Sequence, residues 1–323
     1  MTMLASATAE PYRITENVYL DPNSGHQWDE LIQRDFLADT FHALQELLEP
    51  ELQDVKFYVF SPHRADRVPA SIAFNGQRKV LIFLSDEADS VTPTALSQYY
   101  IAIFKPSMRA EKVGQNIHTM SLGLANGVPA ISGTPMPERQ VDVLFTGNLN
   151  RNRYPLYFAF HPILRKMPKL AHNKLFHLIA RSPLGRLLKR DFSVKTHGVR
   201  LITFTSGFGK GLSRDAYGKM LADSRVVLAP RGFVSAETFR HLEALRAGAV
   251  VVSDKLPDTF LYRNSPIICV DNWSDGLRVV DNLLQDPDRL ECLHAAGLRW
   301  YDEKLSPHAT ARWIIEKVSN ANA

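Results

Sequence analysis

Arg231, Arg240 and Glu243 are the side chains of residues 225–254 whose types and spacing are suited to chemistry. Arg240 and Glu243 lie three residues apart on an expected helix, on a stripe beside its apolar face. A carboxylate at the border of a buried face needs a partner, which is either Arg240 or a hydroxyl group of a ligand. From the spacing alone, an ion pair on a half-exposed helix and a ligand-binding role both stay open.

The elements that must position these side chains form one strand–loop–helix–strand unit. An apolar run at 225–229 predicts a strand that Pro230 ends, and residues 236–247 have helical spacing. A second apolar strand follows at 250–252. In a parallel crossover of this kind the loop 230–235 lies at the carboxyl end of a strand, where open α/β sheets bind ligands.

This stretch resembles the donor-binding signature of exostosin-like glycosyltransferases of GT-B architecture. The residues that carry the resemblance are Pro230, Arg231, Gly232, Ser235, Arg240, Glu243, Ala244, Leu245 and Gly248. The resemblance implies an α/β fold of two Rossmann-like domains facing each other across a cleft. It also implies that the loop and helix hold the diphosphate and ribose of a nucleotide sugar, with Glu243 on the ribose.

One position departs from the retaining members of that architecture. They often have a second glutamate eight residues before the equivalent of Glu243, and here that position is Ser235. Glu237 is acidic but stands at the wrong spacing to replace it. The departure favours an inverting enzyme.

A second motif lies upstream, where an apolar strand at 141–145 runs into a turn. It resembles the opening strand and Phe-x-Gly turn of a GT-B donor domain. Gly147 would let backbone approach a ligand, and Arg151 or Arg153 would neutralise phosphate. A simple turn and helix start is the alternative, because the motif is weak by itself. The expected donor-binding residues are Gly147, Asn148, Arg151, Arg153, Arg231, Gly232, Ser235, Arg240 and Glu243.

An inverting transfer also needs a base that takes the proton of the acceptor hydroxyl. Asp86 and Glu87 follow the apolar run 80–84, and His63 follows the run 56–60, so all three lie at carboxyl ends of expected strands. Helix capping or a solvated loop is the better interpretation for any one of them taken singly. The catalytic residues expected from the sequence are therefore Asp86, Glu87 and His63.

No metal or other cofactor is expected. The acidic pair of Asp286-Pro287-Asp288 lies between two expected helices and is better explained as a turn and cap than as a divalent-ion site. His241 and Glu243 are two residues apart on a helix and point in different directions. The Gly-rich segment 206–211 lacks the Gly-Lys-Ser/Thr ending of a phosphate-binding P-loop.

The block 151–200 is strongly basic, with Asp191 as its one acidic residue. Its anionic partner could be donor phosphate, an anionic membrane surface or nucleic acid, and a solvated basic face without a partner is an equally good interpretation. The membrane surface is favoured over nucleic acid, because no nucleic-acid motif accompanies the charge. The basic residues are Arg151, Arg153, Arg165, Lys166, Lys169, Lys174, Arg181, Arg186, Lys189, Arg190, Lys195 and Arg200.

Length and composition set the organisation of the chain. With 323 residues and 45% hydrophobic content it can build two domains with their own cores. We expect an acceptor-side Rossmann-like domain at 1–138, a nucleotide-sugar-binding one at 139–300, and a C-terminal helix at 301–323 that crosses back to the first domain. Two cysteines, no signal peptide and no long apolar run predict a cytoplasmic protein, peripheral at the inner face of the membrane.

Most elements can be placed from the pattern alone. We expect loosely held residues at 1–25, a helix at 28–48, and a mostly helical segment at 156–190. Further apolar runs predict strands at 56–60, 80–84, 100–104, 117–122, 200–205 and 267–270, and helical spacing predicts helices at 213–221, 274–284 and 291–318.

The sequence therefore predicts an inverting, metal-independent glycosyltransferase. Its partners would be a nucleotide-sugar donor and a glycan or lipid-linked acceptor, in bacterial surface polysaccharide synthesis, with no nucleic acid. Two alternatives stay open: a retaining GT-B enzyme, and a non-catalytic nucleotide- or glycan-binding module that docks on membranes.

Overall fold

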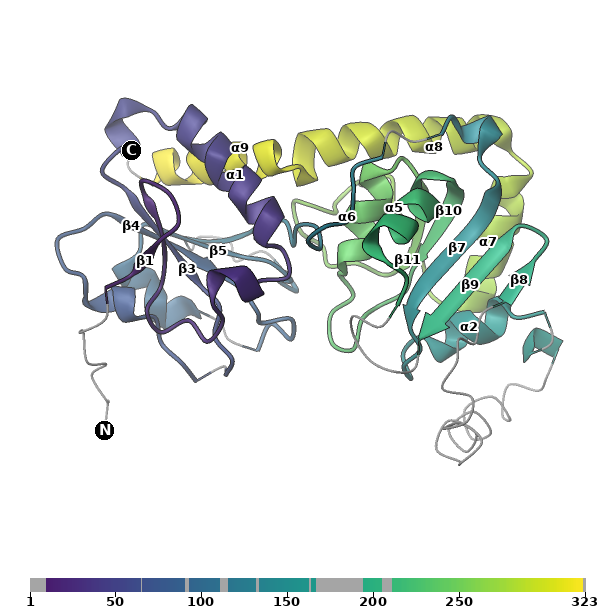
Figure 1. Ribbon diagram of the computed structural model, residues 1–323, viewed down its shortest axis with the longest axis horizontal. Helices are drawn as coiled ribbons and strands as arrows, with labels where there is room; N and C mark the ends of the chain where they lie inside the picture. Colours follow the sequence, from purple (N-terminus) through teal and green to yellow (C-terminus); the bar gives the residue numbers. More distant parts are fainter. Residues whose placement is uncertain are drawn as a thin grey trace. The chain divides into compact units, whose positions relative to one another are not determined.

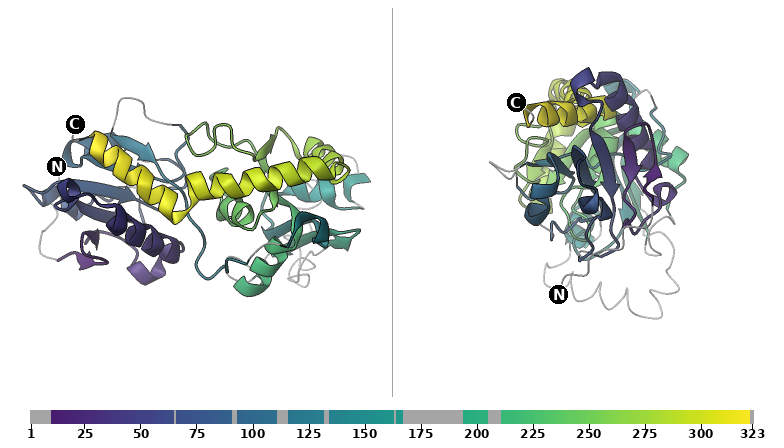
Figure 2. Two further views of the ribbon diagram at one scale, coloured as in Figure 1. Left: turned by 90° about the horizontal axis from the view of Figure 1, so that it is seen from above. Right: turned by 90° about the vertical axis from the view of Figure 1, so that its left-hand side faces the viewer.

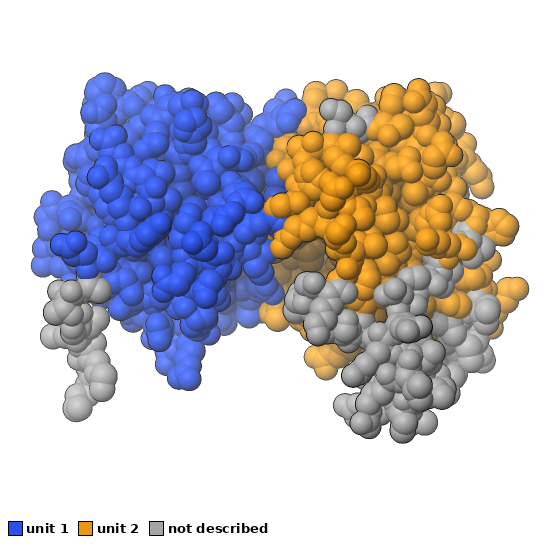
Figure 3. Space-filling model, in the orientation of Figure 1, with its two compact units in different colours: residues 1–126, 257–263, 302–323 blue, residues 127–256, 264–301 orange. Residues whose placement is uncertain are grey.

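A computed structural model describes residues 10–64, 66–90, 93–110, 116–131, 134–162, 164–166, 194–204 and 211–321. The chain packs as two compact units, shown separately coloured in Figure 3. Unit 1 comprises residues 1–126, 257–263 and 302–323, and unit 2 comprises residues 127–256 and 264–301. The domain boundaries expected after residues 138 and 300 concern segments that fold independently, and they stay a prediction.

Unit 1 contains a six-stranded sheet whose strands lie in chain order. Neighbouring strands pair in parallel, except that the short β1 is antiparallel to β2. The expectation of loosely held residues at 1–25 is wrong for the strand β2, because β2 pairs with β3 and its Val18 and Leu20 are buried; residues 1–9 lie outside the described residues. The strands are β1 (Tyr12–Arg13), β2 (Val18–Leu20), β3 (Lys56–Phe60), β4 (Lys79–Phe83), β5 (Ala102–Lys105) and β6 (Ile117–Thr119).

Both faces of this sheet are buried, as expected for parallel strands. Alternate residues such as Phe57 and Val59 pack against the helices α1 (Arg34–Leu47) and α9 (Pro307–Asn320). Their neighbours Tyr58 and Phe60 face a second core. The two helices lie side by side in the left panel of Figure 2, where α9 is yellow and α1 is purple.

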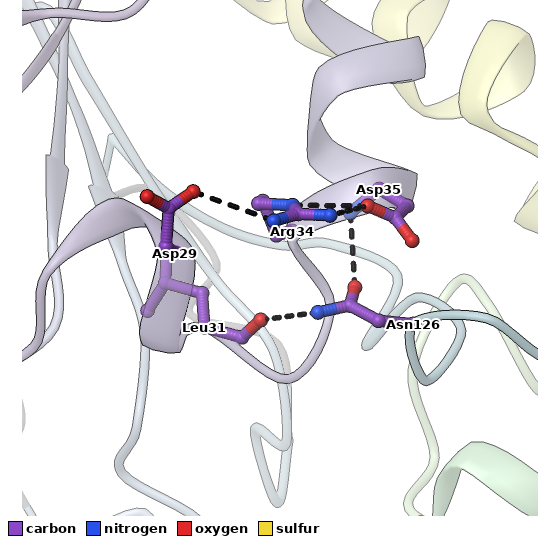
Figure 4. Close-up of polar contacts among 5 residues, drawn as sticks. All are labelled: Asp29, Leu31, Arg34, Asp35 and Asn126. Atoms are coloured by element: carbon purple, nitrogen blue, oxygen red, sulfur yellow. Dashed lines mark hydrogen bonds and ion pairs between the residues drawn. The ribbon is translucent and has the colours of Figure 1, made fainter.

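Helix α1 begins at Arg34, six residues later than the expected helix at 28–48. The Asn126 side chain explains this start (Figure 4). Its Oδ1 accepts from the Asp35 amide at 3.0 Å, and its Nδ2 donates to the Leu31 carbonyl at 2.7 Å. One amide therefore satisfies an orphan N–H of the first helical turn and holds Leu31 in extended conformation before the helix.

Unit 2 has a six-stranded sheet in the order β12-β11-β10-β7-β9-β8 (Figure 1). All its pairs are parallel except β8 with β9, and β8 was not expected from the sequence. The chain passes from β7 to β9 on one side and then returns to β10 on the other, so β7 and β10 flank a topological switch point. The strands are β7 (Val141–Asn148), β8 (Val194–Thr196), β9 (Val199–Phe204), β10 (Ser224–Ala229), β11 (Val250–Asp254) and β12 (Ile268–Val270).

The helices of unit 2 begin at recognisable caps. Ser213 caps α5, Asn272 caps α7 and Asp286 caps α8 through their side chains. The interpretation of Asp286 as a cap is confirmed. The helices are α2 (Tyr154–Phe160), α5 (Arg214–Ala222), α6 (Phe239–Arg246), α7 (Trp273–Leu284) and α8 (Pro287–Trp300).

Short helical turns complete the described chain. They are η1 (Trp28–Glu30), η2 (Pro50–Leu52), η3 (Ala70–Ala73), η4 (Pro93–Tyr99), η5 (Met136–Glu138), η6 (Leu164–Lys166) and the π-turn η7 (Tyr301–Leu305). The expected helix at 156–190 is observed for α2 and η6, and the rest of it lies outside the described residues. The α/β class with two Rossmann-like units is confirmed. Within the described ranges, no helix combines the length and apolarity needed to cross a bilayer.

Candidate functional site

Two arginine side chains converge on Gly147 at the switch point of unit 2. Val227 pairs with Leu144, so the end of β10 is level with Gly147 near the end of β7. A Cβ atom on residue 147 would lie 2.7 Å from Nη2 of Arg240 and 3.2 Å from Nη1 of Arg153. Glycine is therefore the residue that leaves room for both guanidinium groups.

Arg153 is buried, with 8% of its surface exposed, and its side-chain hydrogen bonds go to carbonyl oxygens. Its Nη1 donates to Asn148 at 2.8 Å, and its Nε donates to Arg231 at 3.1 Å. Burial and the positive charge of Arg240 lower the pKa of the Arg153 guanidinium to about 9. Both effects disfavour the charged form, so an anion bound here would be strongly stabilised.

Arg240 lies in the first turn of α6, where the helix dipole disfavours a cation and favours an anion. Its Nη2 donates to the Thr146 carbonyl, and its guanidinium lies over the Phe145 ring at 5.1 Å. Within the described chain, its buried Nε and Nη1 have no hydrogen-bond acceptor. Neither Arg240 nor Arg153 forms an ion pair with a carboxylate among the described residues. Their positive charges are therefore not neutralised there, and Nε and Nη1 of Arg240 can still donate hydrogen bonds.

The loop after β10 closes beside the same strand ends. Asp254 accepts from the Arg231 amide at 2.8 Å, and burial raises the pKa of that carboxyl. The Asn152 side chain donates to the carbonyls of Gly232 and Phe233. Phe233 is 54% exposed at the tip of the loop. The loop is thus held by contacts at its base and presents an apolar tip.

Glu243 is buried on α6, and sequence reasoning did not identify one of its partners. The Tyr217 hydroxyl, from α5, donates to Glu243 Oε2 at 2.9 Å. Burial and the neighbouring carboxylate raise the pKa of Tyr217 well above its ordinary value, while the nearby Arg240 lowers it. Tyr217 stands 26 residues away in sequence, so helical spacing could not indicate it.

The structure uses the other expected donor residues in different ways. Asn148 contributes its carbonyl to Arg153, and the Gly232 amide donates to the Ser235 carbonyl. The Ser235 hydroxyl accepts from the Glu237 amide, and Glu237 is itself buried. Arg151 is exposed in the turn before α2. The structure therefore brings Gly147, Asn148, Arg153, Arg231 and Arg240 together at one edge of the sheet.

In unit 1, Asp86 and its neighbours surround a buried lysine. Lys105 Nζ lies 2.8 Å from Asp86 Oδ2 and also contacts Asp89. The second oxygen of Asp86 accepts from the amide and hydroxyl of Ser90. A carboxylate held in this way is poorly placed to accept a further proton. Glu87 is exposed.

His63 lies at the carboxyl end of β3 against a second histidine, His26, which sequence reasoning missed. Their ring centroids are 4.1 Å apart in an edge-on arrangement. Nδ1 of His26 lies 3.1 Å from both the carbonyl and the hydroxyl oxygen of Ser61, whose hydroxyl is 2.6 Å from that of Ser85. Two histidines and two serines thus meet at the ends of β3 and β4.

The remaining expectations concern metal ions and the basic block. Among the described residues, no three His, Cys, Asp or Glu side chains form a group that could hold a metal ion. Cys269 and Cys292 are exposed free thiols. Residues 167–193, which include Lys169, Lys174, Arg181, Arg186, Lys189 and Arg190, lie outside the described residues.

No protein-family model matches the sequence, and no curated protein matches it. Solved structures that resemble it include TarM (TM-score 0.47, 12% identity, 87% of this chain and 57% of that chain). Others are an alpha-glucosyltransferase in complex with UDP (0.45, 10%, 87% and 84%) and Anabaena HepE in complex with UDP-glucose (0.45, 12%, 87% and 82%). This chain spans little more than half the length of TarM. Likeness at this level does not place the chain in the family of any of these proteins.

Proposed function

We propose that this protein is a glycosyltransferase that moves a sugar from a nucleotide-sugar donor to a glycan or lipid-linked acceptor. One observation carries the proposal: the paired guanidinium groups of Arg153 and Arg240 around Gly147, at the switch point between β7 and β10. Open α/β sheets bind ligands at such points. The spare N–H groups of Arg240 suit a ligand with several anionic oxygens, which a nucleoside diphosphate has.

The chemistry of transfer explains why this charge matters. When the bond between the anomeric carbon and the diphosphate oxygen breaks, the electron pair leaves with the diphosphate. Fixed guanidinium groups in a buried site stabilise that developing charge without reorganising. The N-terminus of α6 adds a favourable dipole for the same anion. Glu243, on the same helix, would hold the ribose of the donor.

We further propose an inverting and metal-independent mechanism, in surface polysaccharide synthesis. Ser235 supports inversion, because it stands where retaining relatives of this architecture often have a glutamate. The two arginines support metal independence, since they supply positive charge that a divalent cation could otherwise supply. The anomeric configuration of the product tests inversion, and activity in the presence of a chelator tests metal independence.

Titration with a panel of nucleoside diphosphates tests the donor site. At least one should bind, and Arg240→Ala should weaken that binding by about 10-fold or more, the loss expected for a charge-assisted hydrogen bond. Arg278→Ala is the matched control, because Arg278 is an exposed arginine of the same unit. Full affinity in both Arg240→Ala and Glu243→Ala would refute the assignment of the donor site.

A non-catalytic binding module would use the same anion site without turnover. Incubation with labelled nucleotide sugars separates the two functions, because an enzyme transfers or slowly hydrolyses its donor. Membrane docking through residues 151–200 is proposed separately. Liposomes with anionic lipid should then sediment the protein at low salt and release it at high salt. Protein that stays in the supernatant at low salt would rule out the membrane surface.

A further inference from the structure

Asp254 places a carboxylate at the same edge of the unit 2 sheet as the two guanidinium groups. It is the last residue of β11, which pairs in parallel with β10, so it lies at the carboxyl end of its strand. The hydroxyl of Ser253, one residue earlier, donates to the carbonyl of Ala229, the last residue of β10, at 3.0 Å. The ends of β10 and β11 are therefore fixed to each other, and Asp254 stands on a rigid strand.

The backbone of Arg231 joins this carboxylate to the anion site. Its N–H donates to Asp254 Oδ2 at 2.8 Å, and its carbonyl accepts from Arg153 Nε at 3.1 Å. One residue of backbone spans at most about 3.6 Å. Asp254 and Arg153 thus lie on either side of a single residue, and a group attached to an anion at Arg153 is within reach of Asp254.

The Asp254 carboxylate has capacity for further hydrogen bonds. An ionised carboxylate can accept about four of them. Within the described ranges its donors are the Arg231 amide and the neighbouring Trp273 side chain, and no lysine or arginine forms an ion pair with it. Burial raises the pKa of this carboxyl, whereas Arg231 and Trp273 lower it. A donor supplied by a ligand would stabilise the charged form further.

A carboxylate beside an anion site selects the group that is attached to the anion. Its negative charge repels a diphosphate, so diphosphate binding does not explain it. Hydroxyl groups donate to carboxylates, and the sugar of a nucleotide sugar carries several of them next to the diphosphate. Arg153 and Arg240 already bring positive charge to the diphosphate, so the sugar is the part of the donor that Asp254 suits best.

We propose that Asp254 recognises the sugar of the donor by accepting a hydrogen bond from one of its hydroxyl groups, beside the diphosphate held by Arg153 and Arg240. The proposal rests on the proposed glycosyltransferase function and deepens it, because it concerns the specificity of the same site. A charged acceptor is selective, since a donor that lacks the hydroxyl leaves the carboxylate unpaired. The contact with the Arg231 amide has a separate role, which is to hold the loop.

Asp254→Asn tests recognition without removing the loop contact, because the asparagine oxygen can still accept from the Arg231 N–H. The titrations use UDP, GDP, ADP and dTDP, and then UDP-glucose, GDP-mannose, ADP-glucose and dTDP-glucose. For the nucleoside that binds to the wild type, affinity for the diphosphate should not fall in Asp254→Asn. Affinity for the nucleotide sugar should fall by about 10-fold or more, the loss expected for a charge-assisted hydrogen bond.

Asp223→Asn is the matched control. Asp223 is another partly buried aspartate of unit 2 that accepts from a backbone amide, that of Gln140, at 2.9 Å. It directly precedes β10 and so lies at the opposite edge of the sheet, where its replacement should change neither affinity.

A second measurement starts from the wild-type protein and does not depend on the folding of a variant. Nucleotide sugars that lack one sugar hydroxyl at a time are titrated in turn. At least one of them should bind about 10-fold more weakly than the complete nucleotide sugar. The loss should be absent in Asp254→Asn, because the two changes remove the same hydrogen bond.

The outcomes separate this proposal from the proposed function. Binding of a nucleoside diphosphate with an unchanged ratio of the two affinities in Asp254→Asn would overturn sugar recognition and leave the donor site standing. Equal binding of every deoxygenated analogue by the wild type would do the same. A loss that requires Mg²⁺ and vanishes with a chelator would show that Asp254 holds a cation instead. A wild-type protein that binds none of these nucleotides would refute the donor site, and sugar recognition with it.

Discussion

Replacing Gly147 by alanine should disrupt the anion site directly. The new Cβ atom would lie 2.7 Å from Nη2 of Arg240, which is closer than non-bonded atoms of this kind approach. With φ of 154°, residue 147 has a backbone conformation that side-chain-bearing residues seldom adopt, so alanine is strained there, and the guanidinium must also move to relieve the clash. That movement breaks its hydrogen bond to the Thr146 carbonyl and misplaces the donors that would meet a diphosphate.

The magnitude follows from the contacts that are lost. One charge-assisted hydrogen bond contributes about 1.5–3 kcal/mol. At about 1.4 kcal/mol per tenfold change, nucleoside diphosphate affinity should fall by about 10- to 150-fold in Gly147→Ala. Isothermal titration calorimetry measures this, with Gly297→Ala in α8 as the control, because its Cβ atom would meet one side-chain atom, Cδ2 of Leu245 at 3.2 Å, and no arginine.

A double-mutant cycle distinguishes the clash from general destabilisation. In Arg240→Ala, a Cβ atom at residue 147 no longer meets Arg240, so the second substitution should cost much less than it does in the wild-type background. Additive losses would show that Gly147 acts through the backbone rather than through Arg240. Affinity within twofold of wild type in Gly147→Ala would refute the site geometry.

Three further predictions concern stability, each measured by denaturant unfolding. Burial lowers the pKa of His241 to about 4, so between pH 6.5 and 4 the unfolded chain binds more protons than the folded one. The free energy of unfolding should therefore fall as pH drops through that window, and less steeply in His241→Gln. An unchanged slope in His241→Gln would contradict a buried neutral ring. Asn126→Ala should lower the free energy of unfolding by about 1–2 kcal/mol through loss of two hydrogen bonds at the start of α1, whereas exposed Asn320→Ala should not. Tyr217→Phe should cost about 1–3 kcal/mol because Glu243 loses a buried donor, and a neutral effect would show that this hydrogen bond adds nothing.

Local pattern was sufficient to place most elements. The strand at Lys56–Phe60, the cap at Ser213 and the βαβ unit around α6 follow from apolar runs, turn residues and capping residues that act over a few positions. The same is true of Gly147, Arg153 and Arg240 as candidates, because their residue types and their places after strands are visible in the sequence. The expected start of the long first helix failed, since Asn126 supplies its first hydrogen bond from 91 residues away.

The sequence by itself determined the α/β class and the residues able to meet an anion, because periodicity and side-chain chemistry are local. Only the tertiary structure decided which of them meet. Gly147 and Arg240 are 93 positions apart and converge because β7 and β10 are neighbours in the sheet. Likewise, Lys105 forms an ion pair with Asp86, and His26 contacts Ser61, whose hydroxyl contacts that of Ser85, in loops that follow neighbouring strands. Contacts between distant segments depend on the order of strands, which no short pattern of residues specifies.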